Sequence, residues 1–290
     1  MTTASTSPSP SNPAPSFGLI IVGDEILSGK RQDKHLPKVI ELLAARGIAL
    51  DWAEYVGDSP ERITATLKRA FASGDIVFST GGIGATPDDH TRQCAAKALG
   101  VALALHPEAE VLIRQRMQDI AKEHGAQYLP DAPDNIHRLN MGTFPVGAQI
   151  IPNPYNKIPG FYVLGGSEPH AVAQHGGVFF VPGFPVMAWP MVEWVLDTVY
   201  PHLHRNQAYV EKSVIVFGAM EAALTPLMLR LETEHTGIKV FSLPSVDHPQ
   251  YGRHIELGVK GSPEDVALAY PVMLAGLHQF GAKTGPELVR

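Results

Sequence analysis

The sequence contains a single cysteine, Cys94, among 290 residues, so no disulfide can form within the chain. This usage fits a reducing compartment, and we expect a cytoplasmic protein. No apolar run reaches the ~20 residues that a membrane-spanning helix needs, which predicts no membrane partner. Basic residues are also not in excess, since 23 Lys and Arg stand against 29 Asp and Glu. Because nucleic-acid phosphates are bound by basic surfaces, we expect no nucleic-acid partner.

The first 16 residues, MTTASTSPSPSNPAPS, contain no apolar segment and no basic start. A secretory signal peptide needs both features. The richness in Ser, Pro, Ala and Thr instead predicts a disordered leader over residues 1–16, because such a composition buries too little surface to offset the entropy of ordering.

Beyond the leader, short apolar runs alternate with amphipathic segments. The apolar fraction of 44% is sufficient for a substantial core. The run DIVFS is apolar throughout its middle, as expected of a strand covered on both faces. This alternation predicts an α/β fold with a mainly parallel, doubly wound sheet. The expected strands are 17–23, 48–56, 75–79 and 178–183, and the expected helices are 34–46, 59–71, 89–99, 108–122 and 186–199.

The C-terminal part has a different order of elements. After a stretch dense in Pro and Gly, the chain ends with a βαββα pattern, typical of a small α+β domain. Its expected strands are 209–217, 238–243 and 254–259, and its expected helices are 221–234 and 263–280. We therefore expect an α/β domain over residues 17–204 and an α+β domain over residues 205–290.

The stretch TGGIGATPDD, residues 80–89, follows a predicted strand and allows two interpretations. In the first, it is an ordinary turn into a helix. Thr86 then caps the helix, Pro87 takes its first position, and Asp89 completes a capping box.

In the second interpretation, the same stretch binds a charged ligand. Gly81, Gly82 and Gly84 would let backbone N–H groups approach a phosphate at the carboxyl end of the strand. Asp88 and Asp89 would repel that phosphate unless a cation lay between them. This interpretation predicts a divalent metal, with Mg²⁺ expected first and Mn²⁺ or Co²⁺ as alternatives, together with a small phosphorylated ligand.

Two further loops favour the second interpretation. GDEILSG, residues 23–29, places Asp24 and Glu25 at the end of the first strand, on the same edge of the sheet. PNPYNKIPGF, residues 152–161, offers Lys157 as a phosphate contact. Alone, the first loop is a surface turn and the second a proline-stiffened connection, but two acidic glycine loops on one edge indicate a shared site.

These motifs, together with VPGFPVMAWPM and in this order, resemble the MoaB/MogA-type molybdopterin-binding domain family. The similarity is closest to the N-terminal part of the competence/damage-inducible protein CinA, and GDEIL also resembles the corresponding domain of FAD synthase. The resemblance covers roughly residues 17–202. The C-terminal part is similar to the small KH-type domain that follows in CinA.

The resemblance implies a three-layer α/β/α domain with its pocket at the glycine loops. Relatives of this type bind molybdopterin, adenylylate it, or hydrolyse the pyrophosphate of ADP-ribose or FAD with a divalent metal. Position by position, Asp89 and Glu25 match acidic functional residues of the family, Thr91 follows Asp89 by two residues, and Gly81, Gly82 and Gly84 match its phosphate-binding glycines. We expect Glu25, Asp88 and Asp89 to be the catalytic and metal-binding groups, and the three glycines, Thr86, Thr91 and Lys157 to be the ligand-binding groups.

The sequence also departs from the family pattern. Ala85 replaces a proline in the glycine loop, and Met187 replaces a glutamate in the last loop, which removes one carboxylate. The segment GAMEAA lacks the G-x-x-G loop that clamps nucleic acid in KH domains. We therefore interpret the C-terminal domain as structural or oligomer-forming, and expect a homo-oligomer, a dimer rather than a trimer.

Two functions of different class follow from the resemblance. One is a metal-dependent nucleotide pyrophosphatase acting on ADP-ribose- or FAD-like dinucleotides. The other is a non-catalytic binding protein for molybdopterin or a related pterin phosphate in molybdenum cofactor metabolism. The glycines serve both, and the missing glutamate adds weight to binding.

Deleting residues 1–16 should leave the melting temperature of the protein within a degree or two of its original value, because a disordered leader makes no stabilising contacts. Differential scanning calorimetry of the full and shortened chains measures this. A larger loss would mean that the leader packs on the folded body.

Overall fold

The computed structural model describes residues 15–165, 176–204 and 210–290, so the predicted leader lies almost wholly outside the described residues. The chain divides into two compact units, Met1–His204 and Arg205–Arg290.

The first unit is built on a six-stranded sheet with the order β2-β1-β3-β8-β7-β6. The four strands β2, β1, β3 and β8 pair in parallel, and the last two pairs are antiparallel. The mainly parallel sheet is thereby confirmed. The strands are β1 (Phe17–Val22), β2 (Trp52–Val56), β3 (Ile76–Thr80), β6 (Gln149–Ile151), β7 (Gly160–Leu164) and β8 (Gly177–Val181).

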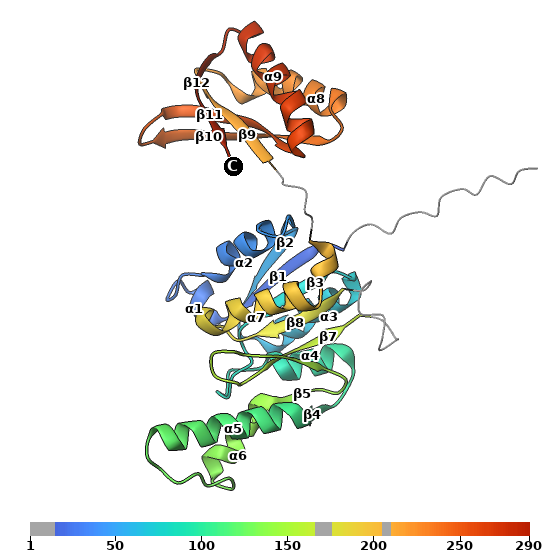
Figure 1. The fold of residues 1–290 in the computed structure, drawn as a ribbon, viewed down its shortest axis with the longest axis vertical. Helices are drawn as coiled ribbons and strands as arrows, with labels where there is room; N and C mark the ends of the chain where they lie inside the picture. The colour runs from blue at the N-terminus through green and yellow to red at the C-terminus, as the bar shows by residue number, and fades with distance from the viewer. Residues whose placement is uncertain (1–14, 166–175, 205–209) are drawn as a thin grey trace, which may run out of the picture. The chain divides into compact units, whose positions relative to one another are not determined.

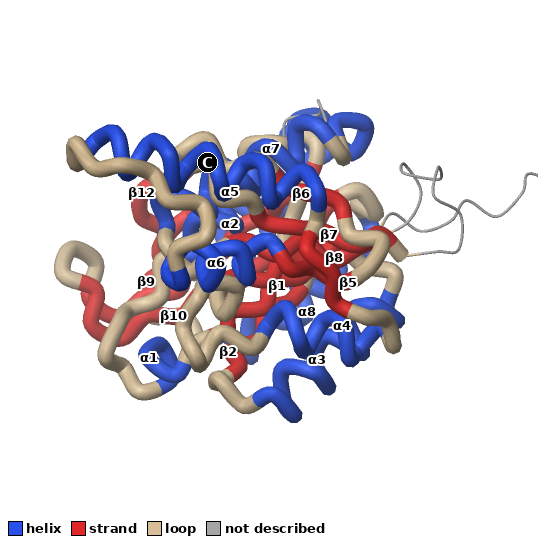
Figure 2. Tube along the Cα trace, turned by 90° about the horizontal axis from the view of Figure 1, so that it is seen from below, coloured by secondary structure: helices blue, strands red, loops and turns tan. Residues whose placement is uncertain are grey.

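Helices cover both faces of this sheet, which makes the three layers that the resemblance implied (Figure 1). Figure 2 shows α2 and α7 on one side of the central strands and α3 and α4 on the other. All residues of β3 are buried, as a strand between two helical layers requires. The helices are α1 (Asp24–Leu27), α2 (His35–Ala44), α3 (Pro60–Ser73), α4 (Thr91–Leu99) and α7 (Pro185–Thr198).

Local signals fix where these helices begin and end. In α3, the Ser59 hydroxyl accepts a hydrogen bond from the Arg62 amide at 3.4 Å, and Pro60 takes the first helical position. The helix stops at Gly74, which adopts a left-handed conformation with φ 77°.

A smaller lobe is inserted between α4 and β6. It contains β4 (Leu103–Leu105), α5 (Pro107–Glu123), α6 (Pro133–Leu139) and β5 (Thr143–Pro145). Three stacked rings connect it to the sheet: the Phe144 ring lies 4.7 Å from Phe161 of β7, which lies 4.3 Å from Phe180 of β8. The sequence predicted no helix or strand between residues 135 and 177, but the described part of this segment forms the end of α6 and the strands β5, β6 and β7.

The second unit is an antiparallel four-stranded sheet, ordered β10-β11-β9-β12, with two helices packed on it. This confirms a small α+β domain. The last strand was missed, because Lys283–Val289 has only two large apolar side chains and its Gly-Pro pair is typical of a turn. The elements are β9 (Val210–Phe217), α8 (Glu221–Glu234), β10 (Ile238–His248), β11 (Gly252–Gly261), α9 (Pro263–Gln279) and β12 (Lys283–Val289).

Phe161→Ala should lower the free energy of unfolding by about 3–5 kcal/mol, because it removes the central ring of the buried stack and leaves a cavity. Chemical denaturation measures the loss. Tyr155→Ala is the control, since that ring is 63% exposed and should cost little. Similar losses from the two substitutions would contradict a role for the stack.

Candidate functional site

The carboxyl ends of β1, β3 and β8 meet at one edge of the sheet, where their loops surround a cavity of about 550 Å³. The predicted groups Glu25, Asp88, Asp89 and Thr86 line it together with the three predicted glycines. We call this space the acidic cavity. The other lining residues come from several elements: Arg31 from the α1–α2 loop, Asp58 from the β2–α3 loop, Asn153 and Asn156 from the β6–β7 loop, Phe184 from the β8–α7 loop and Met187 from α7.

The loop between β3 and α4 folds around Asp89, and Thr86 does not cap α4. Oδ2 of Asp89 accepts hydrogen bonds from the Thr86 amide at 2.8 Å and from its hydroxyl at 2.6 Å. The helix begins at Thr91, and no side chain caps it. The interpretation of Thr86 as a helix cap with Pro87 in the first turn is therefore wrong. Because Thr86 and Asp89 bond to each other and close a turn, the helix begins two residues later than expected.

The buried residue Thr91 holds the glycine loop in place through two hydrogen bonds. It is fully buried, its hydroxyl donates to the carbonyl of Gly81 at 3.1 Å, and its amide donates to the carbonyl of Gly82 at 3.0 Å. Gly82 has a left-handed φ of 68°, and a Cβ there would collide with the Thr91 hydroxyl. The glycines therefore have a packing role of their own, in addition to leaving the loop backbone open to a ligand.

Four consecutive backbone amides in this loop have no acceptor. Within the described part of the chain, no hydrogen bond involves the N–H groups of residues 82–85. Buried or cavity-lining amides are normally paired in proteins. A run of unpaired N–H groups beside a helix N-terminus is a favourable environment for an anion.

A fourth carboxylate, Asp58, joins the predicted acids. It lies in the loop after β2, where its Oδ2 accepts the Asp24 amide at 2.9 Å and its own amide donates to Asp24 Oδ1 at 3.2 Å. Burial raises the pKa of Asp58, and the negative charges of Asp24, Glu25 and Asp88 raise it further. Asp58 could not be singled out from the sequence, because Gly-Asp-Ser-Pro is also an ordinary helix start.

Lys157 is not brought into the acidic cavity. Its Nζ forms an ion pair with Asp119 Oδ2 of α5 at 2.6 Å, and its backbone has a φ of 67°, unusual for a residue with a side chain. Two asparagines of the same loop line the cavity instead. Asn153 is buried and donates to Asn156 Oδ1 at 2.8 Å, and Asn156 donates to the sulfur of Met187 at 3.2 Å.

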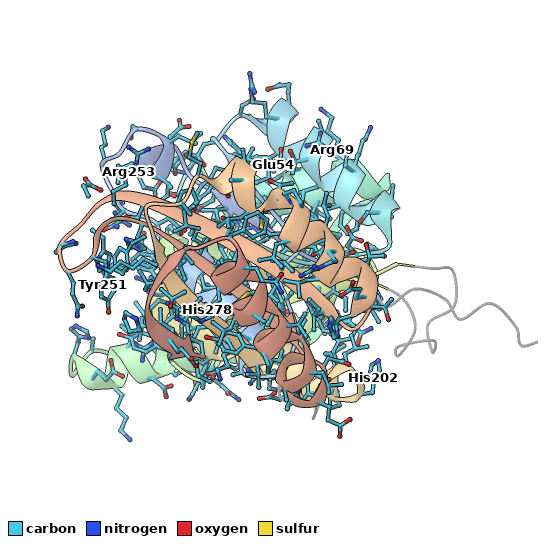
Figure 3. All side chains as sticks on the ribbon, turned by 90° about the horizontal axis from the view of Figure 1, so that it is seen from above. Glu54, Arg69, His202, Tyr251, Arg253 and His278 are labelled. Carbon is cyan, nitrogen blue, oxygen red and sulfur yellow. The ribbon has the colours of Figure 1, made fainter. Side chains whose placement is uncertain are left out.

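A larger open groove, of about 770 Å³, runs between β2 and α3. Two of its charged side chains are paired, since Arg69 Nη2 lies 2.8 Å from Glu54 Oε1 (Figure 3). No buried side chain without a hydrogen-bond partner, within the described residues, lines this groove. It therefore has less to offer a ligand than the acidic cavity.

Comparison with known proteins identifies the family of the first unit. Residues 18–204 match the family of probable molybdopterin-binding domains. The chain belongs to this family. The matched residues of this molybdopterin-binding-domain protein include the whole acidic cavity, and the resemblance to the MoaB/MogA type is confirmed.

Named relatives extend the similarity. A CinA-like protein from Geotalea uraniireducens is 30% identical over 84% of this chain and 53% of its own length. A putative competence-damage inducible protein from Alkaliphilus metalliredigens is 31% identical over 70% of this chain and 45% of its own length. The chain thus spans about half the length of these relatives. The solved structure of CinA from Thermoplasma acidophilum is 25% identical, with a TM-score of 0.51 over 64% of this chain and 98% of that chain.

The described residues contain no helix long and apolar enough to cross a bilayer. They also contain no cluster of three or more His, Cys, Asp or Glu side chains arranged to hold a metal ion. The carboxylates of the acidic cavity are therefore near one another without forming a closed metal cage.

Asp58→Asn should increase the free energy of unfolding at neutral pH, measured in EDTA, by roughly 0.5 kcal/mol. A carboxyl group whose pKa is raised by folding stabilises the protein below its ordinary pKa, and that contribution is lost as the pH rises through the folded-state pKa. The gain from removing the charge should therefore be present at neutral pH and absent below about pH 3. Asn keeps the oxygen that accepts the Asp24 amide.

Thermal unfolding of this variant and of Asp131→Asn, which alters an exposed acid outside the cavity, separates the effects. Equal stability of Asp58→Asn and the unchanged protein at neutral pH would contradict electrostatic crowding in the acidic cavity.

Proposed function

We propose that the protein is a metal-dependent nucleotide pyrophosphatase that acts on dinucleotides of the ADP-ribose or FAD kind. One observation carries the proposal: four unpaired backbone amides and four carboxylates line the same cavity. The amides suit phosphate oxygens, whereas the carboxylates repel them. A ligand that satisfies both must bring a cation with its phosphates.

The donor set fits such a cation. Glu25, Asp58, Asp88 and Asp89 provide hard carboxylate oxygens, which Mg²⁺ and Mn²⁺ prefer. Mg²⁺ is commonly held by one or two carboxylates together with substrate phosphates rather than by a complete protein cage. Mg²⁺ is thus the first choice, with Mn²⁺ or Co²⁺ as alternatives. When bound, the cation would offset the charge of the phosphate oxygens.

The proposed reaction needs a water molecule and a proton acceptor. The water oxygen forms a bond to one phosphorus, the bridging P–O bond breaks, and its electron pair leaves with the other phosphate. Glu25 accepts the proton of the water, since its carboxylate has no hydrogen-bond donor within the described residues. Asp89 orders the loop through Thr86, and the amides of residues 82–85 hold the phosphate oxygens.

Asp89 lies close to a buried charge that the sequence interpretation missed. Arg92 is only 4% exposed, and its Nε and Nη1 have no partner within the described residues. Burial lowers the pKa of Arg92, and the negative charge of Asp89 opposes this effect. Asp89 therefore stabilises both the loop, through Thr86, and a buried guanidinium.

Asp89→Asn should lower the rate of AMP release from ADP-ribose or FAD by on the order of 10²-fold, because it removes a charge from the reacting centre. Asn keeps an acceptor oxygen for Thr86, so the free energy of unfolding should fall by only about 1–2 kcal/mol. Release of AMP is measured with and without Mg²⁺, Mn²⁺ or Co²⁺, and should require one of them.

Asp131→Asn is again the matched control and should keep full activity. Near-normal turnover by Asp89→Asn, with its fold intact, would reduce Asp89 to a purely structural residue and count against the proposal.

A second candidate is a non-catalytic binding protein for molybdopterin or a related pterin phosphate. Two observations favour it: the description of the family as probable molybdopterin-binding domains, and Met187 in place of a carboxylate at the cavity wall. A protein that is inert on every dinucleotide, with or without metal, but retains a pterin phosphate tightly would support this candidate over the enzyme.

A further inference from the structure

A second, smaller cavity adjoins the acidic cavity. It has a volume of about 280 Å³ and lies between the start of α2 and the β8–α7 loop. Arg31, Lys34, His35 and Thr80 line it, and we call it the basic pocket. The two cavities share part of their walls, namely Val22, Glu25, Arg31, Gly183 and Phe184.

The charges of the two cavities are opposite. Four acids line the acidic cavity and Arg31 is its one cationic lining residue within the described residues. In the basic pocket, Arg31 and Lys34 face a single acid, Glu25. Neither of these two cations forms an ion pair in the described part of the chain. Both are therefore available to a ligand.

The pocket also contains two buried polar atoms without partners. His35 is 5% exposed and Thr80 is 1% exposed, and neither His35 Nδ1 nor Thr80 Oγ1 has a hydrogen-bond partner within the described residues. The Nε2 of His35 lies 3.0 Å from the carbonyl oxygen of Gly183, which can only accept, so Nε2 donates there. Leaving buried polar atoms unpaired is costly, which points to a ligand or water as their partner. The Thr80 hydroxyl can donate to an anion, whereas Nδ1 of a neutral His35 ring is an acceptor and suits a water molecule.

Asp33, which precedes Lys34 in the sequence, forms no ion pair with Arg31 or Lys34 within the described residues. Asp33 accepts the amides of His35 at 2.8 Å and Leu36 at 3.0 Å, and the Tyr55 hydroxyl at 2.9 Å. These three bonds hold the start of α2 in place and occupy the carboxylate. Arg31 is placed by its own amide, which donates to the carbonyl of Glu25 at 2.9 Å.

We infer that the basic pocket binds the phosphate that leaves when the pyrophosphate bond is cleaved, an inference that rests on the proposed function. As the bridging P–O bond breaks, its electron pair moves onto the leaving phosphate, which becomes a monoester carrying between one and two negative charges at neutral pH. Arg31 and Lys34 stabilise that added charge. The phosphate that water attacks stays in the acidic cavity, where the loop amides, and the cation when bound, would contact it.

The test measures binding of inorganic phosphate and of AMP in EDTA by isothermal titration calorimetry, so that no turnover contributes. Lys34→Gln should weaken the binding of both by about tenfold, because one charge-assisted contact is lost. Lys30→Gln is the matched control: Lys30 lies in the same loop, is exposed, and lines neither cavity. Its phosphate affinity should stay within about twofold of the unchanged protein.

Thr80→Val provides a second, independent measurement. It removes a buried hydroxyl that has no partner in the free protein, so the melting temperature without phosphate should not fall. If the hydroxyl contacts phosphate, the same variant should bind phosphate several-fold more weakly.

The outcomes separate the two proposals. Equal phosphate affinity in Lys34→Gln and Lys30→Gln, or normal phosphate binding by Thr80→Val, would overturn the assignment of the basic pocket. Phosphate binding that depends on Lys34 and Thr80, in a protein that cleaves no dinucleotide, would support the phosphate site and contradict only the pyrophosphatase.

Discussion

The contact of Thr91 with the backbone of the glycine loop determines most of the site. Because the buried Thr91 holds the carbonyls of Gly81 and Gly82, those carbonyls turn toward α4. The amides that follow then have no internal acceptor. The helix begins at Thr91, and the preceding residues are left to close their own turn around Asp89. One side chain in the core thus sets the loop conformation, the helix start and the position of a carboxylate.

Charge separation is the second organising feature of this edge of the sheet. Asp58, Asp88 and Asp89 line the acidic cavity in the loops before α3 and α4, whereas Arg31 and Lys34 line the basic pocket just before α2. Glu25 and Arg31 line both cavities and therefore lie at the boundary between them. A phosphorylated ligand that extends from one cavity into the other contacts side chains of opposite charge in the two. In a single cavity that held both, the carboxylates and the cations would instead form ion pairs with one another.

The sequence predicted the parallel sheet and much of the acidic cavity, because both depend on local signals. Strand β3 was recognisable from five apolar or small residues, and the ends of parallel strands must share one edge. Asp58 and the basic pocket could not be predicted in this way. Their side chains meet only through tertiary packing of α1, α2 and the β8–α7 loop, and residues 30–35 look like a solvated charged turn. Lys157 was expected at a phosphate because its pairing with Asp119, 38 residues away, leaves no trace in the local pattern.

The single thiol of the chain lies between the two helices that support the glycine loop. Cys94 is 2% exposed, its Sγ contacts the carbonyl of Pro60 at 3.4 Å, and burial raises the pKa of the thiol. Since only an accessible thiolate reacts with alkylating agents, modification of Cys94 requires α3 and α4 to separate. The rate at which Cys94 is alkylated therefore measures how often α3 and α4 separate locally. It reports on the scaffold beneath the site without any added label.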